Sequence, residues 1–140
     1  MSGVIDSLVA IVGSVEGVAE VQDNAFDSPQ NYPAVMIDIP GERPLEPEEL
    51  PVTSLDLGQK IDIGVAQEIG RDQGDARVAR DLVLSLSRRI RSALEQNRNL
   101  SGACLQSQLG DTRMIYASWD GSNKAVAWLE LAVQIEEELS

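Results

Sequence analysis

The sequence has no histidine, a single cysteine and few basic side chains. Only 11 Lys and Arg residues stand against 23 Asp and Glu residues in 140, giving a formal charge of −12. Phosphate binding depends on clustered basic side chains, so this balance argues against a general nucleic-acid binder, and acidic lipid is disfavoured likewise. The absence of histidine excludes the usual zinc sites and the Cys-His and Ser-His-Asp catalytic arrangements. Cys104 has no partner for an intramolecular disulfide.

Sequence motifs for catalysis are also missing. No phosphate-binding loop, zinc spacing, nucleophile elbow or dinucleotide fingerprint is present. Carboxylate pairs are numerous, but a glycosidase-type pair would need a cleft and usually aromatic sugar platforms, and aromatic residues make up only 4% of the chain. Cys104 has no evident activating base, which favours a small, half-buried hydrophobe. We therefore predict no catalytic residue, no cofactor and no metal site.

The first 17 residues form an apolar stretch without a basic beginning, and Asp6 interrupts it. This pattern is typical of neither a signal peptide nor a membrane span. We expect a protein that is made and folded in a reducing cytoplasm, with no membrane partner.

Proline is confined to one part of the chain, between Pro29 and Pro51. The stretch at about 40–57 combines prolines with acidic residues, which regular strands and helices do not accommodate. We predict a single domain, 1–140, with an extended Pro/Glu-rich loop. A disordered linker is one interpretation, but long loops inside domains are commonly functional, which favours a partner-binding arm. Its candidate contact residues are Glu42, Arg43, Pro44, Glu46, Glu48 and Glu49.

Hydrophobic periodicity predicts two helices and four or five strands. Helical spacing begins after Ser2 and ends at Gly13 or Gly17, and a longer helix, capped by Asp72 or Asp75, runs to about residue 96. Alternating patterns predict strands over 33–39 and 60–69, and weaker ones over 18–21 and 103–109. A hairpin with its turn at Asp120-Gly121 ends the chain. This order, α-β-β-β-α-β-β, predicts an α+β fold in which both helices pack on one face of a mixed or antiparallel sheet.

Strict alternation along the predicted strands places acidic side chains on the sheet face without helices. That face is then strongly acidic. The candidate residues for this acidic face are Asp38, Asp62, Glu68, Glu130 and Glu136.

Arginines gather on the side of the long helix that is opposite its apolar stripe. They form a solvated face, a nucleic-acid site or a subunit interface, and the net charge weakens the second interpretation. A subunit that has both acidic and basic surfaces can make head-to-tail contacts, which close into rings. The candidate interface residues are Arg77, Arg80, Arg88 and Arg91.

Two tryptophans flank the predicted hairpin turn. Trp119 and Trp128 are expected to pack against each other across the hairpin, as cross-strand aromatic pairs commonly do. Trp128 shares its face with Glu130, so it is also a candidate contact with a partner protein. The alternative is that it packs at the edge of the core.

Several strings, in this order, resemble the tail terminator (tail-completion) proteins of long-tailed bacteriophages. They are NYPAVMIDIPGE, KIDIGVAQEI, DARVARDLVLSLSRRIRSALEQN and AVAWLELAVQIEEE. The likeness is one of layout and hydrophobic pattern over nearly the whole chain, and the Pro/Glu loop departs from it.

The resemblance implies a structural virion protein, assembled in the host cytoplasm, at the head-proximal end of the tail. Such subunits form a ring, taken to be a hexamer, that caps the tail tube protein, stops its polymerisation and offers a surface to a head-tail connector or neck protein. DNA passes through without specific binding, and an acidic lumen would repel its phosphates. The alternatives are another head-tail neck or joining adaptor and a non-viral acidic protein-protein interaction domain.

Overall fold

The computed structural model describes residues 2–23, 28–39, 57–104 and 106–135. Its elements follow the predicted order, which confirms the α+β class. They are α1 (Ser2–Gly13), β1 (Glu20–Gln22), β2 (Ala34–Asp38), β3 (Leu57–Glu68), α2 (Asp75–Glu95), β4 (Gln106–Trp119) and β5 (Ser122–Ile135). The Pro/Glu stretch, including Glu42 to Glu49, lies outside the described residues. Neither described helix is long and apolar enough to cross a membrane.

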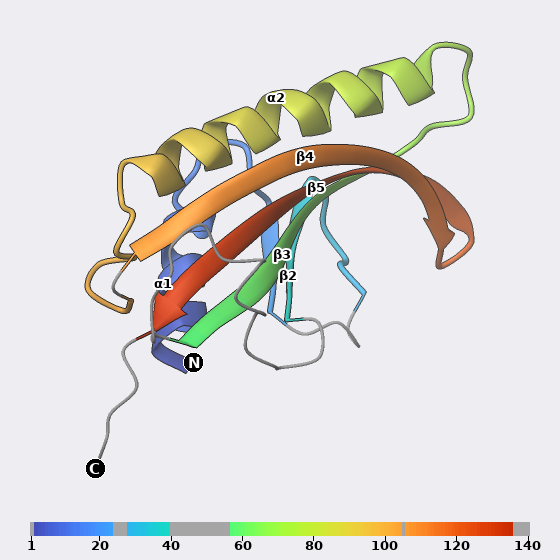
Figure 1. Ribbon diagram of the computed structural model, residues 1–140. Helices are drawn as coiled ribbons and strands as arrows, with labels where there is room; N and C mark the ends of the chain where they lie inside the picture. Colours follow the sequence, from blue (N-terminus) through green and yellow to red (C-terminus); the bar gives the residue numbers. More distant parts are fainter. Residues whose placement is uncertain (1, 24–27, 40–56, 105, 136–140) are drawn as a thin grey trace.

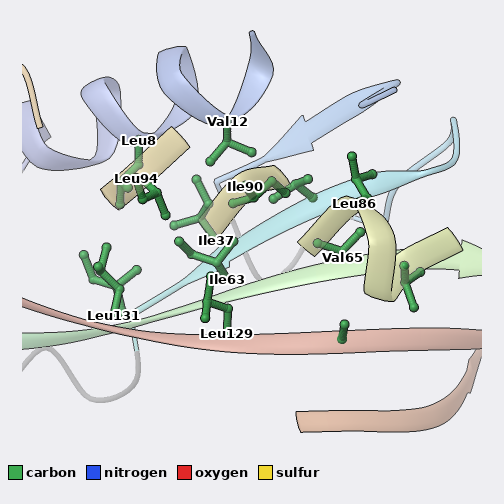
Figure 2. Packing of buried hydrophobic residues seen from close by; sticks show 14 of the residues in the cluster. Leu8, Val12, Ile37, Ile63, Val65, Leu86, Ile90, Leu94, Leu129 and Leu131 are labelled. Carbon is green, nitrogen blue, oxygen red and sulfur yellow. The ribbon is translucent and has the colours of Figure 1, made fainter. Parts of the chain in front are cut away.

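The five strands form one mixed sheet in the order β1-β2-β3-β5-β4. β1 and β2 are parallel, and the other neighbouring strands are antiparallel. Both helices lie on the same face of this sheet, as predicted (Figures 1 and 2). Arg89 of α2 donates to the carbonyl oxygen of Glu16 just after α1, at 2.8 Å, which ties the two helices together.

The core lies between the helices and the odd-numbered residues of β2, β3 and β5. Ile37, Ile63 and Leu129 follow one another across β2, β3 and β5 and are almost completely buried (Figure 2). The α2 stripe packs onto them as predicted, except that Ser87 is buried there and Leu82 is only half-buried. Ser87 satisfies its hydroxyl by donating to the carbonyl oxygen of Leu84, at 2.9 Å.

The start of α2 differs from the prediction. Neither Asp72 nor Asp75 caps it, because the N-cap is Gly74, in a left-handed conformation with φ of 89° and without a side-chain cap bond. Glycine adopts this conformation without the strain that a Cβ brings. Asp75 instead accepts a hydrogen bond from the backbone N–H of Asp72, at 2.8 Å, and so holds the preceding turn.

The final hairpin is longer than the sequence pattern indicated. The separate strand expected near 103–109 is wrong, because residues 106–109 begin β4 and a register shift between Leu109 and Thr112 interrupts their alternation. The turn at Asp120-Gly121 is as predicted, and both residues have positive φ, as a two-residue hairpin turn requires.

Candidate functional site

Three carboxylates form a row across the middle of the sheet, on the face that the helices leave uncovered. Asp38 of β2 is in register with Asp62 of β3, and Asp62 is in register with Glu130 of β5. Alternation alone predicted that these three residues share a face, and the register now brings them side by side. We call Asp38, Asp62 and Glu130 the acidic row.

Charges within the acidic row are only partly compensated. Lys60 pairs with Glu130 at 3.2 Å, and both side chains are about half exposed. Burial raises the pKa of the Asp62 carboxyl above its ordinary value; Lys60 and Arg113 oppose this shift, whereas Glu130 and Asp38 reinforce it. The neighbouring carboxylates in the row thus add to the effect of burial and make ionisation of Asp62 less favourable.

The remaining acidic candidates are not part of this row. Glu68 lies on the same face but near the hairpin end of the sheet, opposite Lys124. Glu136 is outside the described residues. Between the row and the hairpin end the same face buries apolar side chains, Ala66 and Val126 among them. The acidic row thus crosses the middle of this face, while Glu68 and Glu20, the latter in register with Ala34, place further carboxylates outside the row.

Lys124 is a buried cation at the hairpin end that sequence reasoning missed. Its side chain is 1% exposed, and its ammonium group donates to the carbonyl oxygens of Trp119 and Ser122 and to the Ser122 hydroxyl. The ammonium nitrogen also lies 4.8 Å from the Trp119 ring centroid and 5.9 Å from that of Tyr32. Carbonyl dipoles and aromatic faces replace water around this charge.

The two tryptophans occupy separate places, so the expected cross-strand pair is wrong. Trp119 is opposite Ser122 and donates to the Tyr32 hydroxyl at 3.1 Å, whereas Trp128 is opposite Arg113. The Trp128 ring covers Gly64, where a Cβ would lie 2.7 Å from a ring carbon. Trp128 is therefore a half-buried cover of the sheet on the helix-free face.

The four predicted interface arginines have different surroundings. Arg91 donates to the carbonyl oxygen of Gly110 at 2.5 Å and to the Thr112 hydroxyl at 3.2 Å, so it secures β4 within its own fold. Arg80 pairs with the neighbouring Asp81 at 3.3 Å. Arg77 and Arg88 are exposed and have no partner among the described residues. We call the four the arginine stripe; Arg91 places it on the side of α2 that faces β4.

Cys104 is a poor candidate for a nucleophile. Burial raises the pKa of the Cys104 thiol, which disfavours the thiolate needed for attack. Within the described part of the chain, no group of three Asp, Glu or Cys residues is placed to hold a metal ion. No family model matches the sequence, and no curated protein matches it.

Proposed function

We propose that this chain is a structural subunit resembling phage tail terminators. It forms a ring, taken to be a hexamer, that caps the tail tube, stops its polymerisation and provides the surface for head-tail joining. The observation that carries the proposal is the separation of charge: the acidic row lies on the helix-free face, whereas the arginine stripe lies on α2, above the opposite face.

The acidic row supports the proposed role in DNA passage. In the proposed ring this band faces the lumen, where its carboxylates repel the phosphates of the passing DNA and prevent it from sticking. The single ion pair within the band, between Lys60 and Glu130, leaves Asp38 and Asp62 without a salt-bridge partner among the described residues. A lumen that must guide DNA without binding it needs this excess of negative charge.

The arginine stripe supports the proposed self-assembly. Arg77 and Arg88 are exposed cations on a chain with a charge of −12. A second copy therefore offers them many carboxylates, and a contact between two different surfaces is the head-to-tail type that closes into rings. One open end of the proposed ring meets the tail tube protein and the other meets a connector or neck protein. The subunit needs no cofactor for this role.

Light scattering of the purified chain, electron microscopy and pull-down with purified tail tubes test the proposal. The expected result is a closed ring that binds tube ends. Binding to portal complexes but not to tubes would instead favour a neck protein. A monomer at high concentration that binds neither would leave only an acidic interaction domain and would overturn the proposal.

The role of the acidic row has its own test. Reversing two of its charges, with Asp62→Lys and Glu130→Lys, should leave ring size unchanged but make the ring retain duplex DNA in a gel-shift assay at low salt. The neutral pair Asp62→Asn and Glu130→Gln is the matched control and should retain much less. Equal DNA retention by the wild type and the reversed variant would contradict a lumenal position.

A further inference from the structure

Negative charge gathers in the N-terminal part of the fold, where no basic side chain compensates it. The first Lys or Arg of the sequence is Arg43, so α1, β1 and β2 carry neither. The helix α2 has the opposite balance, with five arginines against three acidic residues. The described residues 2–23 and 28–39 hold five carboxylates, which are Asp6, Glu16, Glu20, Asp23 and Asp38.

Two of these carboxylates lie in the helix layer. Asp6 is on the outer side of α1, opposite the buried side that Leu8 and Val12 mark. Glu16 follows in the turn after α1, where Arg89 binds its carbonyl oxygen and leaves its carboxylate aside. Both residues are exposed, and neither forms an ion pair within the described part of the chain. We call Asp6 and Glu16 the α1 carboxylates.

A third carboxylate, on the neighbouring strand β1, is held by uncharged donors. Glu20 accepts hydrogen bonds from Gln22 Nε2 at 2.8 Å, the backbone N–H of Gln30 at 3.1 Å and Asn31 Nδ2 at 3.3 Å. The bond from the Gln22 amide contributes most to lowering the pKa of this carboxyl below its ordinary value. These donors keep Glu20 ionised without cancelling its charge, so it adds to the negative field of this edge.

The arginine stripe belongs to the opposite edge. The sheet order places β1 at one edge and β4 at the other, and α1 packs against β1. Arg91 ties α2 to β4, whereas Arg89 marks the side of α2 that faces α1. Helical spacing puts Arg77 and Arg88 on the side of Arg91. The exposed arginines and the α1 carboxylates therefore point away from each other within one copy.

This placement of charge selects the type of contact between two copies. If two copies met through the same surface, arginines would lie beside arginines or carboxylates beside carboxylates, which is repulsive. The arginine stripe of one copy against the α1 carboxylates of the next pairs opposite charges instead. Because the two surfaces belong to opposite edges, every copy can use both at once, and the contact repeats from copy to copy as in a ring.

Apolar side chains accompany the charges on both surfaces. Leu84 is half-buried and lies one helical turn from both Arg80 and Arg88. On α1, the half-buried Val9 lies one turn after Asp6. A contact between the two helix faces would thus have apolar side chains next to its charged pairs. It uses side chains of described residues and requires no pairing of strands.

We infer that the arginine stripe of one copy docks on the α1 carboxylates of the next copy. This inference deepens the proposed function, on which it rests for the closure of the ring, because it names the surface of the second copy that the arginines meet. Charge complementarity and the opposite placement of the two surfaces select this occupant.

Two charge-reversed variants of the full chain, measured alone and mixed, test the inference. The stripe variant carries Arg77→Glu and Arg88→Glu, and the α1 variant carries Asp6→Lys and Glu16→Lys. Each alone should be a monomer by light scattering at low salt, because its two surfaces now carry charge of the same sign. An equimolar mixture should regain the mass of the wild-type ring, because contacts between unlike variants again pair opposite charges. A ring with an even number of subunits, such as a hexamer, permits this alternation.

Matched controls separate the contact from net charge and from folding. Glu68→Lys with Asp72→Lys makes the same change of charge at exposed residues outside both surfaces, and it should form the ring alone. The milder pair Asp6→Asn and Glu16→Gln should raise the concentration at which the ring dissociates by about tenfold. Circular dichroism checks that each variant is folded, and recovery of the ring on mixing is a result that a misfolded variant does not give.

Purified tail tubes distinguish a failure of this inference from a failure of the proposed function. Wild-type rings that cap tubes, together with an α1 variant that still forms the ring alone or a mixture that stays monomeric, would overturn the inference alone. A mixture that regains the mass of the wild-type ring, when neither the mixture nor the wild type caps tubes, would overturn the proposed function alone.

Discussion

The two faces of the sheet use the same strands for different purposes. Ile63 and Leu129 point toward the helices and are buried, whereas the residues beside them in sequence, Asp62 and Glu130, point to the other face and carry charge. Because successive residues of a strand point to opposite faces, the same strand supplies side chains to the buried core and to the charged surface. The comparison teaches that charge on one face of these strands can change while the core on the other face remains.

The helix-free face is not simply a solvated surface. Ala66, Val126 and Lys124 are almost completely buried there, although no described helix covers them. Trp128 lies over Gly64, and Tyr32 and Trp119 surround the Lys124 ammonium group. Large side chains therefore shield part of this face, and the acidic row crosses another part of it.

The largest expected effect is on the helix-covered face. Leu129→Ala should lower the free energy of unfolding by about 2–5 kcal/mol, because it removes a fully buried side chain and leaves a cavity. Its neighbour Glu130→Ala should cost less than about 1 kcal/mol, since only a half-exposed ion pair with Lys60 is lost. Urea unfolding of both variants measures the contrast. Equal losses would contradict the division between the two faces.

An intermediate effect is expected for Lys124→Met. The substitution keeps the length of the side chain but removes the donor to two carbonyl oxygens and a hydroxyl, and it removes the cation between two rings. We expect a loss of about 1–3 kcal/mol in thermal or urea unfolding. Lys60→Met, at a half-exposed lysine on the same face, is the matched control and should cost less. If Lys124→Met leaves the free energy of unfolding unchanged, the contacts of the ammonium group contribute nothing to the stability of the hairpin end.

The smallest expected effect belongs to the acidic row, and its sign depends on pH. Because the pKa of Asp62 is raised in the folded state, the fold binds more protons than the unfolded chain just above the ordinary pKa of aspartate. The contribution of Asp62 therefore falls as pH rises through the raised value. Asp62→Asn should be more stable than the wild type at pH 7, by less than about 1 kcal/mol, with no such gain at pH 3. A wild type that gains stability over the variant between pH 3 and 7 would contradict this.

Much of the fold could be predicted from sequence because hydrophobic periodicity is a local signal. The alternation around Ile61, Ile63 and Val65 identified β3, and the stripe from Ala79 to Leu94 identified α2. The same alternation assigned Asp38, Asp62 and Glu130 to one face. Strand register, which places the three side by side, depends on pairing between distant segments and required the structure.

What escaped prediction depends on contacts that are distant in sequence or on backbone conformation. Lys124 has an ordinary place in the alternating pattern, and one of the two rings beside its buried ammonium group belongs to Tyr32, which is distant in sequence. The cap at Gly74 depends on a left-handed backbone, which competes with the side-chain caps that Asp72 and Asp75 offered. Arg91 belongs to the arginine stripe by spacing alone, but the bulge in β4 gives it an intramolecular partner.

The most direct test of the proposed ring is the mass of the chain in solution with and without the charges of Arg77 and Arg88. We predict that the wild type forms a closed ring at low salt and that Arg77→Glu with Arg88→Glu reduces it to a monomer of unchanged fold. Arg71→Glu with Arg98→Glu, an equal change of charge at exposed residues outside the arginine stripe, should keep the ring. Light scattering that gives the same mass for the wild type and both double variants would contradict the account.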